Sequence, residues 1–231
     1  VDDFNDEIYV QLTGTYVADN SLKYYNLTSS ANKELSVIQP ANAAYRLFSP
    51  TSIALNTSAN NLYLSYQSAI TTIDLATGDQ ALLSDVSTGT GTALELITDL
   101  AYDPVSNILY AADAKTEIIT EIDQITGNRT TRMFNINQLL SIAINSNNDL
   151  FYSLGINLTG DAAIQKSDGT NISTLYHLLS GSQGGPISDL AINELGDEVF
   201  FVDGNGDLLK MDLKNNSISV IIDNLFYVET F

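Results

Sequence analysis

Cysteine and tryptophan are absent from the 231 residues, histidine occurs once, and lysine and arginine together number only nine. Without cysteine the chain can form no disulfide, no thiolate metal site and no cysteine nucleophile. The 28 acidic residues give a formal net charge of −19, which repels nucleic-acid phosphates and anionic lipid headgroups. No apolar run approaches the ~20 residues that a membrane-spanning helix needs. Nucleic acid and a membrane span are therefore excluded from the expected interactions.

The start of the chain, Val1 to Glu7, is acidic and lacks the pattern of a signal peptide. Few lysines and many Asn, Ser and Thr residues favour an exported, well-hydrated protein. We therefore expect an extracellular or periplasmic location, with any signal peptide already removed. A chain of this length buries roughly 70% of its unfolded surface, which suffices for one domain covering 1–231.

A repeat with a period of about 46 residues runs through the chain. An alanine between two large apolar residues recurs at intervals of 47, 42 and 48 residues. An aromatic residue opens a second apolar run, and Asp or Asn closes a third, at similar intervals. Because three markers keep one period, the sequence predicts five units. The markers are Ala54, Ala101, Ala143 and Ala191; Tyr16, Tyr63, Tyr110, Phe151 and Phe200; and Asn26, Asp74, Asp123, Asp168 and Asp212.

Each unit divides into four short segments with strand-like alternation. In the third unit these are 97–103, 108–113, 117–123 and 129–134, with turn residues between them. No segment has a helical period. Four antiparallel strands in each repeat of this length are typical of a β-propeller blade. The sequence therefore predicts an all-β fold: a five-bladed β-propeller of four-stranded antiparallel blades.

The predicted ring has to be closed by the two ends of the chain. The segments EIYVQLT (Glu7–Thr13) and NLFYVETF (Asn224–Phe231) fit the inner strand of the first blade equally well, so both alternatives stay open. The first unit otherwise lacks the alanine marker. The approximate units are 7–48, 49–95, 96–137, 138–185 and 186–231.

Each marker has a structural role in this architecture. A small alanine lets inner strands crowd around the axis, and the aromatic residue supplies buried area between neighbouring blades. The Asp or Asn that ends the third strand can accept hydrogen bonds from backbone N–H groups of the following turn. We therefore assign all three markers to the scaffold.

Two long segments resemble the repeats of the YWTD and NHL propeller families. They are DLAYDPVSNILYAADAKTEIITEID (Asp99–Asp123) and DLAINELGDEVFFVDGNGDLLKMDL (Asp189–Leu213). The resemblance covers nearly the whole chain and implies the propeller fold. It is generic for function, because such repeats serve lactonases, receptors and binding proteins. The chain departs from these families in having no tryptophan, and in five units where six blades are common.

Ligands usually meet a propeller at one end of its central channel. Two residues before each alanine marker the sequence places an acid or a hydroxyl, and the ends of the second strands add further oxygen groups. Such an acidic mouth suits a cation or a polyhydroxylated ligand. Alternatively, these side chains cap strand ends by bonding backbone N–H groups. The predicted mouth residues are Ser52, Asp99, Ser141 and Asp189, together with Asp19, Tyr66, Asp113 and Asp203.

No catalytic residue and no cofactor are predicted, and calcium is the one ion considered for the mouth. His177 is expected on an outer strand, away from a channel nucleophile. The segment 203–207 (DGNGD) resembles the start of a calcium loop, but Leu208 and Lys214 break that pattern, so we interpret it as a hairpin turn.

The predicted function is non-catalytic recognition of a small polar molecule, a glycan or a partner protein. The alternative is a metal-assisted hydrolase or lactonase that uses the acidic channel mouth. Two loops, 87–92 and 180–186, are expected to be flexible connectors at the ligand-bearing end.

Overall fold

A computed structural model describes residues 7–11, 21–26, 32–36, 50–56, 58–155, 162–178, 186–193 and 195–223. Within these ranges the chain forms strands β1 to β19 and no helix. Accordingly, no helix in the described part of the chain could cross a membrane. The prediction of an all-β fold is confirmed.

The strands form five antiparallel sheets. The first has three strands, β1 (Glu7–Gln11), β2 (Ser21–Asn26) and β3 (Asn32–Ser36), and each later sheet has four strands in chain order. The four-stranded sheets are β4 (Ser52–Asn56), β5 (Asn61–Tyr66), β6 (Ala69–Asp74) and β7 (Gln80–Ser84); β8 (Ile97–Asp103), β9 (Ile108–Asp113), β10 (Ile118–Ile122) and β11 (Arg129–Met133); β12 (Leu139–Ile144), β13 (Leu150–Leu154), β14 (Ala162–Ser167) and β15 (Ile172–Leu178); and β16 (Asp189–Ile192), β17 (Glu198–Val202), β18 (Leu208–Asp212) and β19 (Ser217–Ile222).

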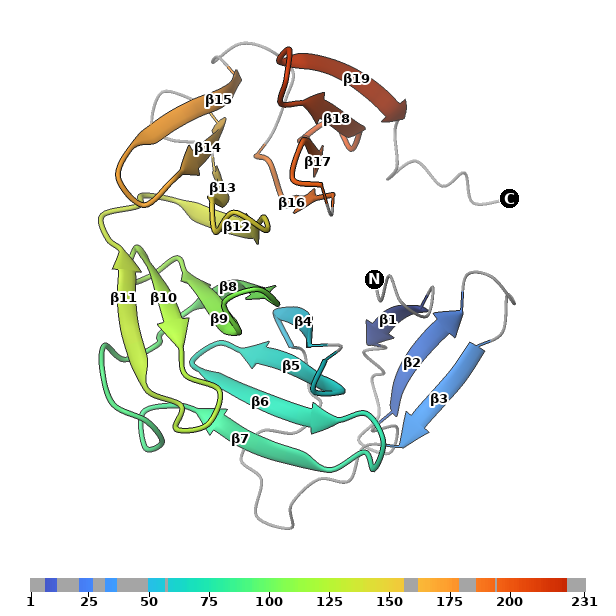
Figure 1. Cartoon of the computed structure of the whole chain (residues 1–231), viewed down its shortest axis with the longest axis vertical. Coiled ribbons are helices and arrows are strands. Elements are labelled where there is room, and N and C mark those ends of the chain that lie inside the picture. The colour runs from blue at the N-terminus through green and yellow to red at the C-terminus, as the bar shows by residue number, and fades with distance from the viewer. Residues whose placement is uncertain are drawn as a thin grey trace.

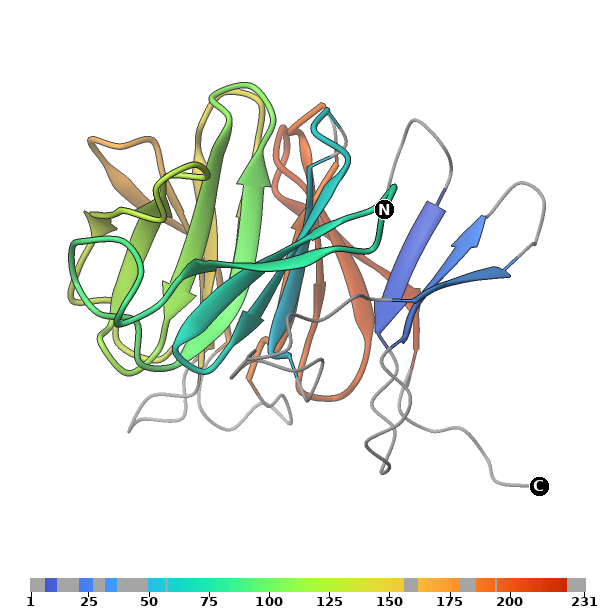
Figure 2. The ribbon, with the colours of Figure 1, turned by 90° about the horizontal axis from the view of Figure 1, so that it is seen from below.

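The sheets are arranged around a common centre, as Figure 1 shows. Strands β4, β8, β12 and β16 lie nearest this centre, and β8 contacts β4 and β12 while β12 contacts β16. Seen from the side, the blades stand next to one another, with their turns at the two ends (Figure 2). The fold is thus a β-propeller of four-stranded antiparallel blades.

Four such blades are found where five were predicted. The N-terminal unit is a three-stranded sheet in the described residues, because β1 pairs directly with β2 from Glu7↔Asn26 to Gln11↔Leu22. The segment expected to lie between them, with Tyr16, is outside the described residues. Glu7–Gln11 of the first candidate closing segment forms β1, and the second candidate, 224–231, is also outside them.

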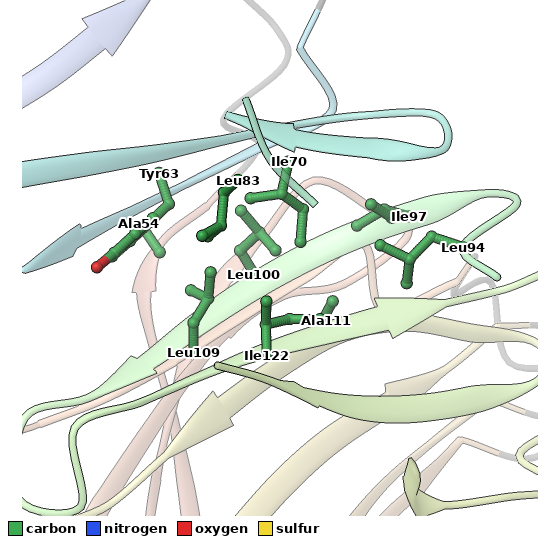
Figure 3. Packing of buried hydrophobic residues seen from close by; sticks show 10 residues of the cluster. All are labelled: Ala54, Tyr63, Ile70, Leu83, Leu94, Ile97, Leu100, Leu109, Ala111 and Ile122. Atoms are coloured by element: carbon green, nitrogen blue, oxygen red, sulfur yellow. The ribbon is translucent and has the colours of Figure 1, made fainter. Parts of the chain in front are cut away.

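The alanine and aromatic markers share a period because they are paired across strands. Ala54 lies opposite Tyr63, and the same pairing recurs in the other three blades. Tyr63 is buried against the next blade, where it packs in one cluster with Leu100 and Leu109 (Figure 3). Burying such side chains contributes about 1.5–3 kcal/mol each. The predicted scaffold role of these markers is confirmed for the first three of these blades, whereas Phe200 in the last one is only half-buried.

The aspartate markers hold the outer hairpin turns. Oδ1 of Asp74 accepts hydrogen bonds from the backbone N–H groups of Ala76 (2.7 Å) and Thr77 (2.9 Å), as predicted. Asp123 and Asp168 make the same pair of bonds in the next two blades. These bonds lower the pKa of all three carboxyls, because they favour the charged form.

The loop 87–92, expected to be a flexible connector, is instead fixed against β11 by a buried arginine. Arg129 is buried, and its guanidinium donates to neutral oxygens at the end of β7 and in the residues that follow it. Gly127 lies beneath it, and its carbonyl accepts a bond from the Ser84 hydroxyl. The acceptors of Arg129 are the carbonyls of Thr92 (2.9 Å), Asp85 (2.8 Å), Thr88 (2.9 Å) and Gly89 (3.3 Å) and Oγ of Ser84 (2.7 Å).

Candidate functional site

The predicted mouth residues of the inner strands are brought together into a chain of hydrogen bonds. Ser52 donates to Oδ1 of Asp99 over 2.6 Å, and Ser141 lies 2.6 Å from Oδ2 of Asp99. On its other side Ser141 lies 3.1 Å from Oδ1 of Asp189. We call these four residues, one from each of β4, β8, β12 and β16, the inner string.

Backbone geometry directs these side chains toward one another. The pairing of β8 with β9 shifts between Ile97 and Asp99, and the pairing of β12 with β13 shifts between Leu139 and Ser141. Such bulges change the direction of a side chain relative to the regular pleat. In both blades the shift occurs at the inner-string residue. It therefore helps to orient the side chains of Asp99 and Ser141 toward the neighbouring inner strands.

Backbone N–H groups complete the inner string. The N–H of Leu100 donates to Oδ1 of Asp99 (2.8 Å), and the N–H of Ile142 donates to its Oδ2 (2.9 Å). With the two serines, the carboxyl of Asp99 therefore accepts four hydrogen bonds. This favours the capping interpretation for Asp99: it joins three inner strands and has its acceptor sites occupied by protein groups.

The inner string has fewer hydrogens than contacts. Three oxygen–oxygen contacts join its four members, but the hydroxyls of Ser52 and Ser141 supply only two protons. Burial raises the pKa of Asp99 to about 6, outweighing the hydrogen bonds from the two serines, and the nearby Asp189 carboxylate raises it further. Below about pH 6 the Asp99 carboxyl carries a proton and supplies the missing donor, and above that pH it accepts all four hydrogen bonds.

This proton predicts an unusual pH dependence of stability. Because the pKa of Asp99 rises from 3.8 to about 6 on folding, the folded state binds the proton more tightly. Its contribution to stability is therefore complete below pH 3.8 and is lost as the pH rises through 6, at most about 3 kcal/mol. In urea denaturation, the stability of the parent relative to Asp99→Asn should fall between pH 4 and pH 7.

Asp168 is the matched control for this measurement. Turn N–H groups lower the pKa of its carboxyl, so its contribution is present above pH 3.8 and is lost only in more acidic solution. The parent minus Asp168→Asn difference should stay level or grow slightly from pH 4 to pH 7. A parent minus Asp99→Asn difference that does not change over this range would show that the inner string holds no proton.

The other predicted mouth residues are used elsewhere. Asp113 accepts backbone N–H bonds from Glu95 (2.6 Å) and from three further residues of the flanking turns. Tyr66 is buried and accepts a bond from Gln80 (3.3 Å). Asp203 accepts N–H bonds from Asn205 and Asp207, in the hairpin turn that was predicted for DGNGD. Asp19 lies outside the described residues.

No cluster of three or more His, Asp or Glu side chains suited to a metal occurs in the part of the chain that the structure describes. His177 lies on the outer strand β15, where it was expected, and it is exposed. It lines a cavity of about 440 Å³ together with Gln138 and Gln165.

Sequence reasoning did not find two hollows beside the β10–β11 turn. One, of about 420 Å³, lies between the second and third sheets, with Tyr63 and Leu82 among its lining residues. The other, of about 440 Å³, is lined by residues of the third sheet alone. Both are bordered by Asn107, Gln124 and Ile125. The one signal in the sequence was an isoleucine in a turn.

Hydrogen bonds of two side-chain amides connect the turns that border the two hollows. The Gln124 side chain donates to the carbonyl of Asn107 over 2.6 Å and accepts bonds from Tyr63 and Asn56 (3.1 Å). Tyr102 donates to Oδ1 of Asn107 over 2.8 Å. The β8–β9 and β10–β11 turns are therefore joined into one rigid surface.

Comparison with known proteins supports the fold alone. No protein-family model and no curated protein matches the sequence. A solved structure of a nidogen/laminin complex matches with a TM-score of 0.69 at 11% identity, covering 89% of this chain and 76% of the matched chain. The fold-level resemblance to YWTD-type propellers is confirmed. The hydrazine synthase of Kuenenia stuttgartiensis matches with a TM-score of 0.54 at 15% identity, over 74% of this chain and 49% of that one.

Proposed function

We propose that this propeller is a non-catalytic recognition domain of an exported protein, and that its ligand is a protein with a basic surface. The observation that carries the proposal is the distribution of charge. In the four-stranded blades, all six Lys and Arg side chains are already engaged. Arg129 is buried beneath its loop, and the ion pairs are Lys115–Glu95, Arg132–Glu121, Lys166–Asp149, Lys210–Glu198 and Lys214–Asp197.

The carboxylates, by contrast, are in large excess, since the whole chain has 28 acidic and nine basic residues. An excess of one sign accelerates association with partners of the opposite sign and disfavours partners of the same sign. The similarity to a chain of a nidogen/laminin complex agrees with protein binding as a use of this fold. It does not identify a partner for this chain.

The inner string supports recognition over catalysis. A catalytic carboxylate must reach a substrate, whereas the Asp99 carboxyl is occupied by two serines and two backbone N–H groups. We also propose that the three-stranded sheet takes the fifth position of the ring, closed by the terminal segments, and that the protein acts outside the cytoplasm, in extracellular or periplasmic space.

The proposal is tested by selection from a phage-displayed library of random twelve-residue peptides. Enriched peptides should carry net positive charge, and their affinity should fall about tenfold or more between 50 and 300 mM NaCl, because salt screens exposed charges. In parallel, lactones and glycosides are incubated with the protein in the presence and absence of Ca²⁺ and Zn²⁺. Enrichment of neutral or acidic peptides, or metal-dependent turnover, would contradict the proposal.

A further inference from the structure

The surface around the β10–β11 turn combines exposed aliphatic side chains with the two hollows. Ile125 is 94% exposed at the tip of the turn, and Val105 on the joined β8–β9 turn is 70% exposed. Leu82, which lines the first hollow, is 37% exposed. Large aliphatic groups that are exposed next to concave surface mark interaction sites more often than isolated ones do.

We propose that this surface, called the turn groove, binds an extended peptide segment of a partner protein, with one apolar side chain in each hollow and basic residues beside them. The inference rests on the proposed function and names the site that would carry it. Because Ile125 borders both hollows, it stands between the two bound side chains.

The charges of the turn groove determine the sign of the peptide. Glu121 and Asp123 line the second hollow, and no basic side chain lines either one. Arg132 offsets part of this charge through its ion pair with Glu121 at 3.3 Å. A lysine or arginine beside the apolar residues of the peptide therefore meets net negative charge.

The side chains also favour a peptide over a sugar. Sugar rings commonly stack on an exposed aromatic face, but the Tyr63 ring at the first hollow is only 1% exposed, and it packs beside Tyr102 at 6.1 Å between ring centroids. The exposed apolar groups are aliphatic instead. The amides of Asn107 and Gln124 lie at the border of both hollows, where they can bond a peptide backbone.

The test uses the intact chain and the peptides enriched in the selection described above. Ile125→Ser removes the exposed side chain without touching the core, and Val105→Ser is a second variant. Leu195→Ser is the matched control, because Leu195 is exposed (79%) and, like Val105, lies in a turn between the first and second strands of its blade. Affinity should fall about tenfold or more for Ile125→Ser, less for Val105→Ser, and not for Leu195→Ser.

The outcomes separate the two proposals. If basic peptides bind the parent, Ile125→Ser and Leu195→Ser equally well, the turn groove is wrong while recognition of basic proteins stands. If no basic peptide is enriched, the proposed function itself fails. Selective loss with Ile125→Ser, together with enrichment of peptides that carry two apolar residues, supports the groove. Binding of glycans on an array with the same sensitivity to Ile125→Ser would replace the peptide by a sugar and overturn the inference.

Discussion

Gly127→Ala is expected to lower the free energy of unfolding by about 4 kcal/mol or more. Gly127 has a φ of +69°, in the left-handed region, and a Cβ placed on it would lie 2.0 Å from the carbonyl oxygen of Leu83. No side-chain rotation relieves this contact, because both partners belong to the backbone. The hairpin would have to move away from the end of β7. This movement would break the hydrogen bond from the Ser84 hydroxyl to the Gly127 carbonyl.

Gly169→Ala is the control for this prediction. Gly169 also has a positive φ, +85°, but a Cβ there meets only the end of the Arg132 side chain, at 3.3 Å. Its cost should be limited to the strain of a left-handed alanine, about 1 kcal/mol. Urea denaturation of both variants measures the difference. Equal costs would show that the clash with Leu83 is relieved by movement, and that the hairpin is not held tightly.

Arg129→Met is expected to cost about 3–5 kcal/mol. The variant keeps much of the aliphatic volume but leaves five oxygens of β7 and the 85–92 loop without their shared donor. Each buried acceptor without a partner costs about 1–3 kcal/mol, although some of these will reach water when the loop moves. Protection of the loop amides in hydrogen exchange should fall together with the stability.

Arg132→Met separates this effect from the loss of any arginine on the same strand. Arg132 is only partly buried and pairs with Glu121 at 3.3 Å. Pairs of this kind contribute about 0–1 kcal/mol. If the two arginine variants lose similar stability, the guanidinium of Arg129 does not hold the loop.

Much of the scaffold was predictable from the sequence because its determinants are local and repeated. The pairing of Ala54 with Tyr63 repeats in each four-stranded blade, so a period of about 46 residues is enough to reveal it. Asp74 and its counterparts bond N–H groups two and three residues away, which sequence also encodes directly. The first unit lacks the alanine marker, and there the prediction of a fourth strand went beyond the three that are described.

The candidate site was only partly predictable. The convergence of Ser52, Asp99, Ser141 and Asp189 followed from their common position in the repeat. Whether their oxygens face a ligand or each other depends on bulges and on backbone N–H groups of the next strand, which no residue pattern specifies. In the same way, the Ser, Thr and Gly content of the loop 87–92 predicts flexibility. Arg129, which is 37 to 41 residues from its acceptors in the loop, fixes it.

The inner string also has two kinds of side chain in alternation. From blade to blade it runs hydroxyl, carboxyl, hydroxyl, carboxyl across the four positions described. An alternation of two kinds closes on itself only in a ring with an even number of members. In a ring of five, one junction has to place like groups side by side or be filled by a different residue. Gene duplication that adds one blade therefore disturbs the electrostatics at the axis, whereas duplication of two adjacent blades preserves them. A propeller built in this way should change its size most readily in steps of two.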